Sequence, residues 1–371
     1  MAVAETVLFS ALAPLLPSFE EELGLSKAQA GLLVAMFPIG LGVAGLPVGL
    51  LASRVSVKGF ALAGLVMLSA AGVAFGLADN YVELLATRFL QGASGALVWS
   101  GALAWLVSSA PRRRRGEMIG IFSGAGSAGQ TLGPVVGGLA VLVGRAGAFG
   151  GVAGFTLLLA IVGARFADPG RGERQPLALI RKAHRSRAVL VAQWLVVVPS
   201  LLFGTIYVLT PLQLHRLGWG SIGIAGTFLA AAAVGVLARP LVGRWADRRG
   251  LVAALRVLLL ACIPVTLVIP WVNHPWVLSV CVVCAVTTYG VLFGPAMALV
   301  SHGYEEAGVA QVLGFALVGL TFGVGFFVGS AAGGAIAHLA GDVTAYALAA
   351  GTCLATFVAL LERARRPTRV A

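Results

Sequence analysis

The chain has 371 residues, of which 59% are hydrophobic and only 11% are charged. This composition, with a mean hydropathy of +0.96, excludes an ordinary soluble domain, in which about a quarter of the residues carry charge. Apolar runs long enough to cross the ~30 Å hydrocarbon core as helices recur from end to end. Because these runs are continuous rather than alternating in polarity, they favour helices over a transmembrane β-barrel.

In chain order, the apolar runs predict an all-α polytopic membrane protein with twelve transmembrane helices. Their expected limits are 1–17, 28–51, 57–78, 82–109, 117–143, 147–165, 188–211, 220–243, 251–271, 276–300, 308–339 and 343–361. The longest polar stretch, residues 166–187, separates the sixth run from the seventh. We therefore expect two six-helix bundles, at 1–165 and 188–371, joined by this linker, with a short basic tail on the second bundle. The first run is slightly short for the hydrocarbon core, and one hypothesis places the natural start upstream of Met1.

The formal net charge of +12 follows the loops and does not indicate a nucleic-acid partner. Lys and Arg gather in alternate loops, such as "PRRRRGE" at 111–117, whereas intervening loops, such as "FEEELGLSK" at 19–27, are acidic or neutral. The positive-inside rule then predicts a multi-pass protein of the plasma membrane with both termini and the linker in the cytoplasm. One loop disagrees, because "HGYEEAG" at 302–308 should be cytoplasmic but holds two Glu and no Lys or Arg.

The two halves of the sequence repeat each other. Residues 49–56, "GLLASRVS", align with residues 243–250, "GRWADRRG", at an offset of 194. Residues 133–138, "GPVVGG", align with residues 329–334, "GSAAGG", at an offset of 196. Nearly equal offsets indicate duplication of a six-helix unit, and parallel repeats with a binding site between them at mid-membrane are typical of transporters.

Three segments resemble signature motifs of the major facilitator superfamily, and the resemblance covers essentially the whole chain. "GLLASRVSVKG" at 49–59 is similar to the family's G-x-L-A-D-R-x-G-R-K motif, with Ser53 and Ser56 in place of Asp and Gly. "RFLQG" at 88–92 resembles the fourth-helix motif R-x-x-Q-G. The fifth-helix motif of the drug/proton antiporters is filled at every position, by Gly120, Gly129, Gly133, Pro134, Gly137 and Gly138. The resemblance implies the two-bundle major facilitator fold, alternating access and, through the fifth-helix motif, export.

The fifth-helix motif also has a physical interpretation. Gly129, Gly133 and Gly137 are spaced by four residues, so they share one face of a helix. A face of small residues lets two helix backbones approach closely in lipid, and Pro134 removes a backbone donor and bends the helix there. A gating role for this smooth, bent face and static close packing are both compatible with the pattern.

Glu5 and Arg88 are the clear ionisable residues within the apolar stretches. A charge inside the bilayer is costly, so it normally faces a cavity or a partner and marks function. We expect the Glu5 carboxyl to exchange a proton for cargo and Arg88 to hold or discharge that site. The alternatives are a Glu5 near the cytoplasmic face without a role, and an Arg88 that binds backbone carbonyls or reaches the outer surface.

The substrate cavity is expected between the bundles, since the resembled family places it there. Trp99 shares a helical face with Arg88 and offers a ring for flat or cationic cargo. The full set of cavity candidates is Gln91, Trp99, Tyr207, Thr288 and Tyr289. For each aromatic residue, ordinary packing explains the sequence equally well.

A latch between the halves is expected on the cytoplasmic face. Basic residues there would hold the halves together when the inner side is closed, although setting the topology is a sufficient alternative. The latch candidates are Gly49, Arg54, Lys58, Gly243, Asp247 and Arg248.

The sequence shows no nucleophile–base set, no metal-ligand spacing and no phosphate loop, so we expect neither an enzyme nor a cofactor or metal. The four cysteines lie in apolar runs and are expected to pack there. The predicted function is proton-coupled export of a small, largely apolar compound by a monomer in the lipid bilayer, with protons as the second partner. A proton symporter or uniporter that imports a metabolite, and a membrane sensor without transport, remain alternatives.

Overall fold

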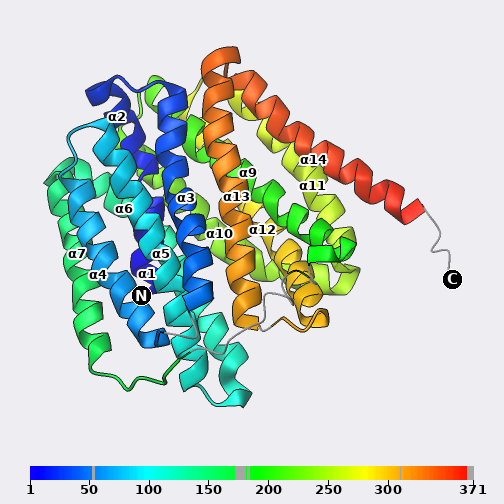
Figure 1. The fold of residues 1–371 in the computed structure, drawn as a ribbon. Coiled ribbons are helices and arrows are strands. Elements are labelled where there is room, and N and C mark those ends of the chain that lie inside the picture. The colour runs from blue at the N-terminus through cyan, green and yellow to red at the C-terminus, as the bar shows by residue number, and fades with distance from the viewer. Residues whose placement is uncertain (52–54, 172–180, 182–183, 310, 366–371) are drawn as a thin grey trace.

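The computed structural model describes residues 1–371 apart from 52–54, 172–180, 182–183, 310 and 366–371. Within these described residues, twelve helices are long and apolar enough to cross a membrane. They lie in two groups of six side by side, with the N-terminal group on the left and the C-terminal group on the right of Figure 1. The predicted all-α fold and the number and order of its spans are thereby confirmed.

The N-terminal half comprises the first six spans. The first span is built from three consecutive segments, and each of the other five is one helix. The elements are α1 (Ala2–Ser10), η1 (Ala13–Leu15), α2 (Leu16–Leu23), α3 (Lys27–Leu51), α4 (Val57–Gly76), α5 (Tyr81–Ser109), η2 (Arg112–Arg114), α6 (Arg115–Val143) and α7 (Arg145–Ala164).

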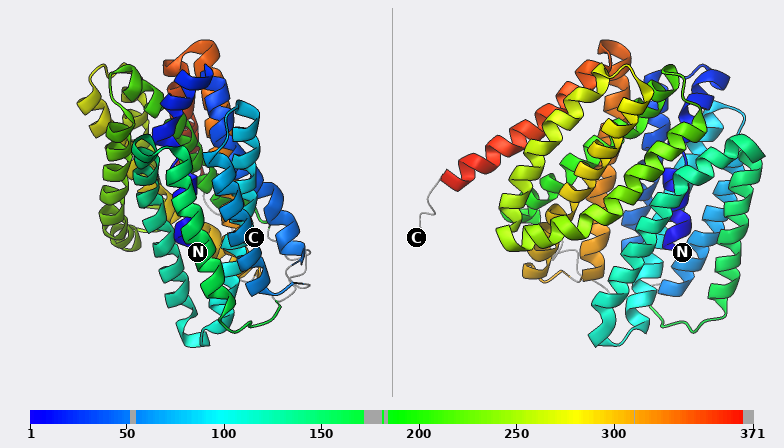
Figure 2. Two further views of the ribbon diagram at one scale, coloured as in Figure 1. Left: turned by 90° about the vertical axis from the view of Figure 1, so that its left-hand side faces the viewer. Right: turned by 180° about the vertical axis from the view of Figure 1, so that it is seen from behind.

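The C-terminal half repeats this arrangement. Its elements are α9 (Arg187–Arg216), α10 (Ser221–Arg249), α11 (Leu251–Val268), η3 (Ile269–Trp271), α12 (Pro275–Glu306), α13 (Gln311–Ala340) and α14 (Asp342–Arg365). The last of these helices leans away from the bundle toward the C-terminus, as both views from front and back show (Figures 1 and 2).

Several helices continue past their predicted ends. The first span ends at Leu23 instead of residue 17, α10 ends at Arg249 instead of residue 243, and α12 ends at Glu306 instead of residue 300. Polarity alone set the expected ends, but Glu and Arg are good helix formers, so a helix continues beyond the apolar core. The chain turns at glycines in left-handed conformation, for example Gly24 with φ 63° and Gly250 with φ 87°.

Close backbone contacts at glycines hold the helices of each half together. A Cβ atom on Gly92 of α5 would overlap the Phe37 carbonyl oxygen of α3, and one on Gly101 of α5 would lie 2.5 Å from the Ala61 nitrogen of α4. Such contacts need a residue without a bulky side chain on at least one of the two helices, and glycine supplies it here. Gly92 belongs to the "RFLQG" motif, so that motif fixes the approach of α3 to α5.

The two halves meet along α3 with α13 and along α6 with α10. At one end of the bundle, polar contacts join them: Lys27 Nζ forms an ion pair with Asp342 Oδ1 at 2.6 Å, and His215 Nε2 lies within hydrogen-bond distance of Glu21 Oε1, at 2.8 Å. We call this end the ion-pair face and the opposite end, which carries residues 166–171, the linker face. In the part of the chain that the structure describes, the Lys27–Asp342 ion pair and the His215–Glu21 contact both lie at the ion-pair face.

Candidate functional site

The glycine face of α6 packs directly on the first span. A Cβ atom on Gly129 would overlap Thr6 Oγ1 and the Val3 carbonyl oxygen, and one on Gly133 would overlap Ser10 Oγ. Farther along, Gly137 faces the carbonyl oxygen of Ala11 in the same way. The partner helix, which the spacing alone does not identify, is therefore α1 with the turn that follows it.

Other positions of the fifth-helix motif have different surroundings. A Cβ atom on Gly138 would lie 2.9 Å from the Ala225 side chain of α10, so this glycine faces the other half. Around Gly120, nothing lies within 4 Å of such an atom. At Pro134, α6 continues as a helix from Arg115 to Val143.

The C-terminal half reproduces this packing. Gly329 of α13 faces the Leu201 carbonyl oxygen of α9, and its own carbonyl accepts a hydrogen bond of 3.1 Å from Thr205 Oγ1. Gly334 faces α3 of the other half, where a Cβ atom would lie 3.0 Å from the Gly31 Cα atom. The repeat seen in the sequence is thus a repeat of contacts: one glycine face toward the first helix of its own half, and one glycine toward the other half.

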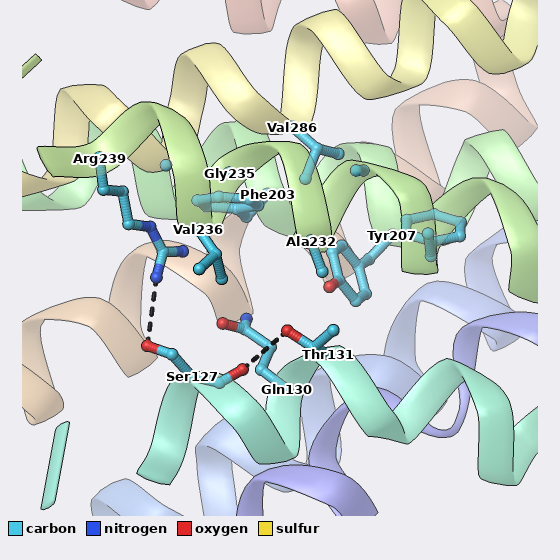
Figure 3. Close-up of a pocket in the computed structure, with 13 residues that line it drawn as sticks. Ser127, Gln130, Thr131, Phe203, Tyr207, Ala232, Gly235, Val236, Arg239 and Val286 are labelled. Carbon is cyan, nitrogen blue, oxygen red and sulfur yellow. Dashed lines mark hydrogen bonds between the residues drawn. The ribbon is translucent and has the colours of Figure 1, made fainter. Parts of the chain in front are cut away.

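A polar cleft lies between the halves, on the side of α6 away from the glycine face (Figure 3). The lining residues of the N-terminal half all come from α6 and are polar. From the C-terminal half, α9, α10 and α12 contribute aromatic and small residues and one cation. The residues of these kinds are Ser127, Gln130, Thr131, Phe203, Tyr207, Phe228, Arg239 and Gly290. The cleft is narrow, with a cavity volume of about 30 Å³.

Arg239 lies at one end of this cleft and points from α10 toward α6. Its Nη1 donates a hydrogen bond of 3.2 Å to Ser127 Oγ, and its Nη2 would lie 3.5 Å from a Cβ atom on Gly290. The side chain is exposed in the cleft. The expectation that Glu5 and Arg88 are the ionisable residues of the spans overlooked this arginine, which occupies the apolar run 220–243.

Glu5 is buried deep in the N-terminal half. Its side chain is 4% exposed, and within the described residues its Oε2 atom has no hydrogen-bond partner. The carboxyl occupies space left by Gly95, since a Cβ atom there would lie 3.0 Å from Glu5 Oε1. Gly95 is the middle residue of α5, roughly 21 Å from either helix end at 1.5 Å per residue. The carboxyl therefore lies at the level of the middle of the bundle and not near the linker face.

Arg88 is 1% exposed and caps the end of α1. Its Nη1 donates hydrogen bonds of 2.9 Å to the Leu8 carbonyl oxygen and 2.9 Å to Gln91 Oε1, and its Nη2 donates one of 3.3 Å to the Phe9 carbonyl oxygen. These carbonyls lie in the last turn of α1, where a helix leaves acceptors unpaired. Over the described residues, Arg88 forms no ion pair with Glu5, which lies about two helical turns farther along α5.

Of the five predicted cavity residues, Tyr207 lines the cleft and the other four do not. Gln91 accepts its hydrogen bond from Arg88, and Trp99 packs against Phe122 of α6 with ring centroids 4.9 Å apart. The Tyr289 hydroxyl lies 2.8 Å from Thr266 Oγ1 inside the C-terminal half. Thr288 Oγ1 donates a hydrogen bond of 2.7 Å to a carbonyl of its own helix.

The sequence contained one signal for the missed cleft residues. Ser127, Gln130 and Thr131 are spaced by three and four residues, so they share a face of α6 as the motif glycines share another. Reading the polar residues of "SAGQTLGP" by the same periodicity predicts a two-sided helix. The contributions from α9, α10 and α12 carry no comparable pattern.

Among the described latch residues, no hydrogen bond or ion pair joins Lys58 to Asp247 or Arg248 across the halves. Lys58 Nζ donates hydrogen bonds of 2.8 Å to the Ala164 carbonyl oxygen of its own half and 2.6 Å to the Phe166 carbonyl oxygen at the start of the linker. In the other half, Asp247 and Arg248 are exposed at the end of α10.

The remaining latch candidates are Gly49, Gly243 and Arg54. Gly49 lies in the last turn of α3, and a Cβ atom on Gly243 would meet nothing within 4 Å. Arg54 lies outside the described residues. Next to Lys58, a hydrogen bond of 2.8 Å from the Gly170 backbone N–H lowers the pKa of the Asp168 carboxyl.

Two six-helix halves with a polar cleft between them define a membrane transporter. The family model described as the Major Facilitator Superfamily matches residues 1–316, so the chain belongs to this superfamily.

Among curated proteins, residues of the chain are 29% identical over 125 residues to the quinolone resistance protein NorA of Staphylococcus aureus, covering 34% of this chain and 32% of that protein. They are 28% identical over 128 residues to an uncharacterised MFS-type transporter of Methanocaldococcus jannaschii, covering 34% and 33%. The chain thus spans about a third of the length of the curated relatives it matches.

Among solved structures, the chain resembles a bacterial homologue of the human lysosomal transporter Spinster. In the inward-facing, occupied conformation the TM-score is 0.75 at 19% identity, covering 98% of this chain and 93% of that chain. In the inward-facing, unoccupied conformation the TM-score is 0.74 at 16% identity, covering 97% and 92%. At these identities the similarity shows the shared fold.

Proposed function

We propose that this chain exports a small, largely apolar compound in exchange for protons, by alternating access between its two halves. The observation that carries the proposal is the Glu5 carboxyl, which is 4% exposed at the middle of the bundle and has an oxygen without a partner among the described residues. A carboxyl without a counter-charge in apolar surroundings is strongly disfavoured in its ionised form. Such a group is suited to take up a proton in one access state and release it in the other.

The proton site and the cleft are connected through α6. One face of α6 packs closely on α1, the helix that carries Glu5, through the contacts of Gly129 and Gly133. The other face presents Gln130 and Thr131 to the cleft. A displacement of α1 when Glu5 gains or loses its proton therefore has a direct route to the cargo side of α6.

The ion pairs indicate which side is closed. Among the described residues, the Lys27–Asp342 ion pair and the hydrogen-bond contact between His215 and Glu21 join the halves at the ion-pair face. Lys and Arg are concentrated on the linker face, so we place that face on the cytoplasmic side of a plasma membrane. We propose a monomer as the transporting unit. In this assignment the outer side is closed and the molecule is inward-facing.

Export also agrees with the filled fifth-helix motif and with the printed name of the relative NorA, a quinolone resistance protein. Inverted membrane vesicles acidified inside test the proposal. With a pH-sensitive dye in the lumen and a panel of apolar compounds outside, an exporter releases luminal protons as a compound enters. Accumulation of a compound only in right-side-out vesicles would instead indicate import.

A further inference from the structure

The cleft has a charge imbalance that bears on its cargo. None of the 13 residues that line it is acidic, and Arg239 is its cation. Within the described residues, no carboxylate lies within 4.0 Å of the Arg239 guanidinium. Glu5 offers no counter-charge there, because it lies beyond α6, against α5.

The rest of the cleft is apolar and aromatic. The Tyr207 ring packs against Phe203 and Phe228, with ring centroids 6.4 Å and 5.0 Å apart. The Tyr207 hydroxyl and the Arg239 guanidinium both face α6 from the opposite wall (Figure 3). The cleft thus has largely buried aromatic rings at one end, of which Tyr207 is 8% exposed, and a cation at the other.

From this arrangement we infer that the cargo is an amphipathic aromatic anion, with a carboxylate or similar planar group on Arg239 and its ring system against Tyr207. Because the cleft has a volume of about 30 Å³ in this state, such cargo enters only when the halves move farther apart. The inference rests on the proposed function and names the substrate class of that site. A guanidinium presents five N–H donors in a fixed fork that matches a carboxylate, and the described contacts use one of them, to Ser127 Oγ.

The position of Arg239 also suits alternating access. Its partner Ser127 comes from the N-terminal half and Arg239 from the C-terminal half, so an anion bound here contacts both halves at once. A cationic cargo meets like charge in the same place, with no acidic lining residue to offset it. The cleft should therefore rank cargo of one shape in the order anion, neutral compound, cation.

Binding of three compounds that share one ring system tests this order on the purified full chain in detergent. The compounds are 2-naphthoate, 2-naphthamide and 2-naphthylmethylammonium. We expect 2-naphthoate to bind about tenfold more tightly than the amide, as charge-assisted hydrogen bonds to a guanidinium suggest, and the ammonium compound to bind most weakly.

The Arg239→Gln variant should lose the preference for 2-naphthoate and keep the affinity for 2-naphthamide, which also reports an intact cleft. Arg239→Lys keeps the charge without the fork, so it should retain part of the preference. The matched control is Arg244→Gln, which removes the same charge from an exposed position of the same helix and should leave all three affinities unchanged.

Equal binding of 2-naphthoate and 2-naphthamide to the wild-type chain would overturn the inference, as would no detectable binding of 2-naphthoate. An equal loss in Arg244→Gln and Arg239→Gln would overturn it too, because net charge would then explain the preference. The proposed function can fail separately. If 2-naphthoate binds through Arg239 but releases no protons from vesicles, proton-coupled export is contradicted and the anion site is not.

Discussion

Arg88 shows how a charged residue is retained inside a membrane protein for a structural purpose. Its two Nη atoms donate hydrogen bonds to two carbonyl oxygens at the end of α1 and to Gln91, whereas its Nε has no partner among the described residues. The centre of the guanidinium lies 5.0 Å from the Phe37 ring centroid. In lipid, a carbonyl left unpaired at a helix end costs several kcal/mol, so the arginine allows α1 to end at mid-membrane. The end of α1 within the first span and the Arg88 side chain that caps it therefore form one structural unit.

We therefore predict that Arg88→Gln destabilises the protein by about 3 kcal/mol, because two backbone acceptors and Gln91 lose their donor. The stability of Arg88→Lys should lie between those of Arg88→Gln and the wild type, since an ammonium cannot bond two carbonyls as the forked guanidinium does. The melting temperature of the detergent-purified chain measures both effects. Arg249→Gln, exposed at the end of α10, is the control with no expected change, and an Arg88→Gln protein that melts with the wild type would refute the capping role.

At the scale of one helix, α6 carries two different faces along the same residues. Gly129 and Gly133 bring it into backbone contact with α1, while Gln130 and Thr131 line the cleft. Any side chain on the glycine face separates α6 from the helix that bears Glu5. In the proposed mechanism, the glycine face is therefore needed for coupling as well as for packing.

Two alanine substitutions separate these roles within one motif. At Gly133 the added Cβ would overlap Ser10 Oγ and lie 2.7 Å from the Val7 carbonyl oxygen, so we predict a loss of about 1–3 kcal/mol in the free energy of unfolding. At Gly120 nothing lies within 4 Å, so Gly120→Ala should be neutral or stabilise the helix by up to about 1 kcal/mol. Thermal melting compares them directly, and equal effects at the two positions would contradict the assigned contact.

These elements also show how far the sequence leads. Hydrophobic runs predicted twelve spans, and glycine spacing predicted a smooth face on the fifth, because both depend on residues close in sequence. The same spacing does not say which neighbour that face meets, and α1 was identified only by the fold. Helix ends were misplaced because Gly24 and Gly250, and not the first charged residues, end their helices.

For the candidate site the sequence was a weaker guide. Glu5 and Arg88 were predicted as site residues because charged residues are rare in the apolar runs. The structure places both deep in the bundle but apart from each other. Aromatic residues such as Trp99 and Tyr289 were chosen by span, yet each points into its own half. A cleft between two halves depends on the rotation of each helix about its axis, and a uniformly apolar helix leaves that rotation undetermined. Arg239, a charged residue in the apolar run 220–243, could have indicated the rotation of α10.

For the whole molecule, Asp342 is the main connection at the ion-pair face. Its two oxygens lie 2.6 Å from Lys27 Nζ of the other half and 2.6 Å from Arg216 Nη2 of its own half. The pairs are partly exposed, so each contributes no more than about 1 kcal/mol. In a two-state equilibrium between access states, even that amount shifts the ratio of populations about fivefold.

We predict that Asp342→Asn shifts the population toward the state that is open at the ion-pair face. Spin labels at Asp79 and Ile222, both exposed at this face and in different halves, report the separation of the halves once the native cysteines are replaced. Glu117→Gln removes an ion pair within one half and should leave the distance distribution unchanged. An unchanged distribution in Asp342→Asn would show that these ion pairs do not hold the outer side closed.

The most direct test of proton-coupled export uses Glu5→Gln in the vesicle assay described above. The amide fills the space beside Gly95 but takes up no proton, so cargo-for-cargo exchange should continue while proton release on addition of cargo disappears. That pair of results would assign the proton to Glu5. Proton release by Glu5→Gln at the wild-type rate would contradict the account, because the buried carboxyl would then have no part in coupling.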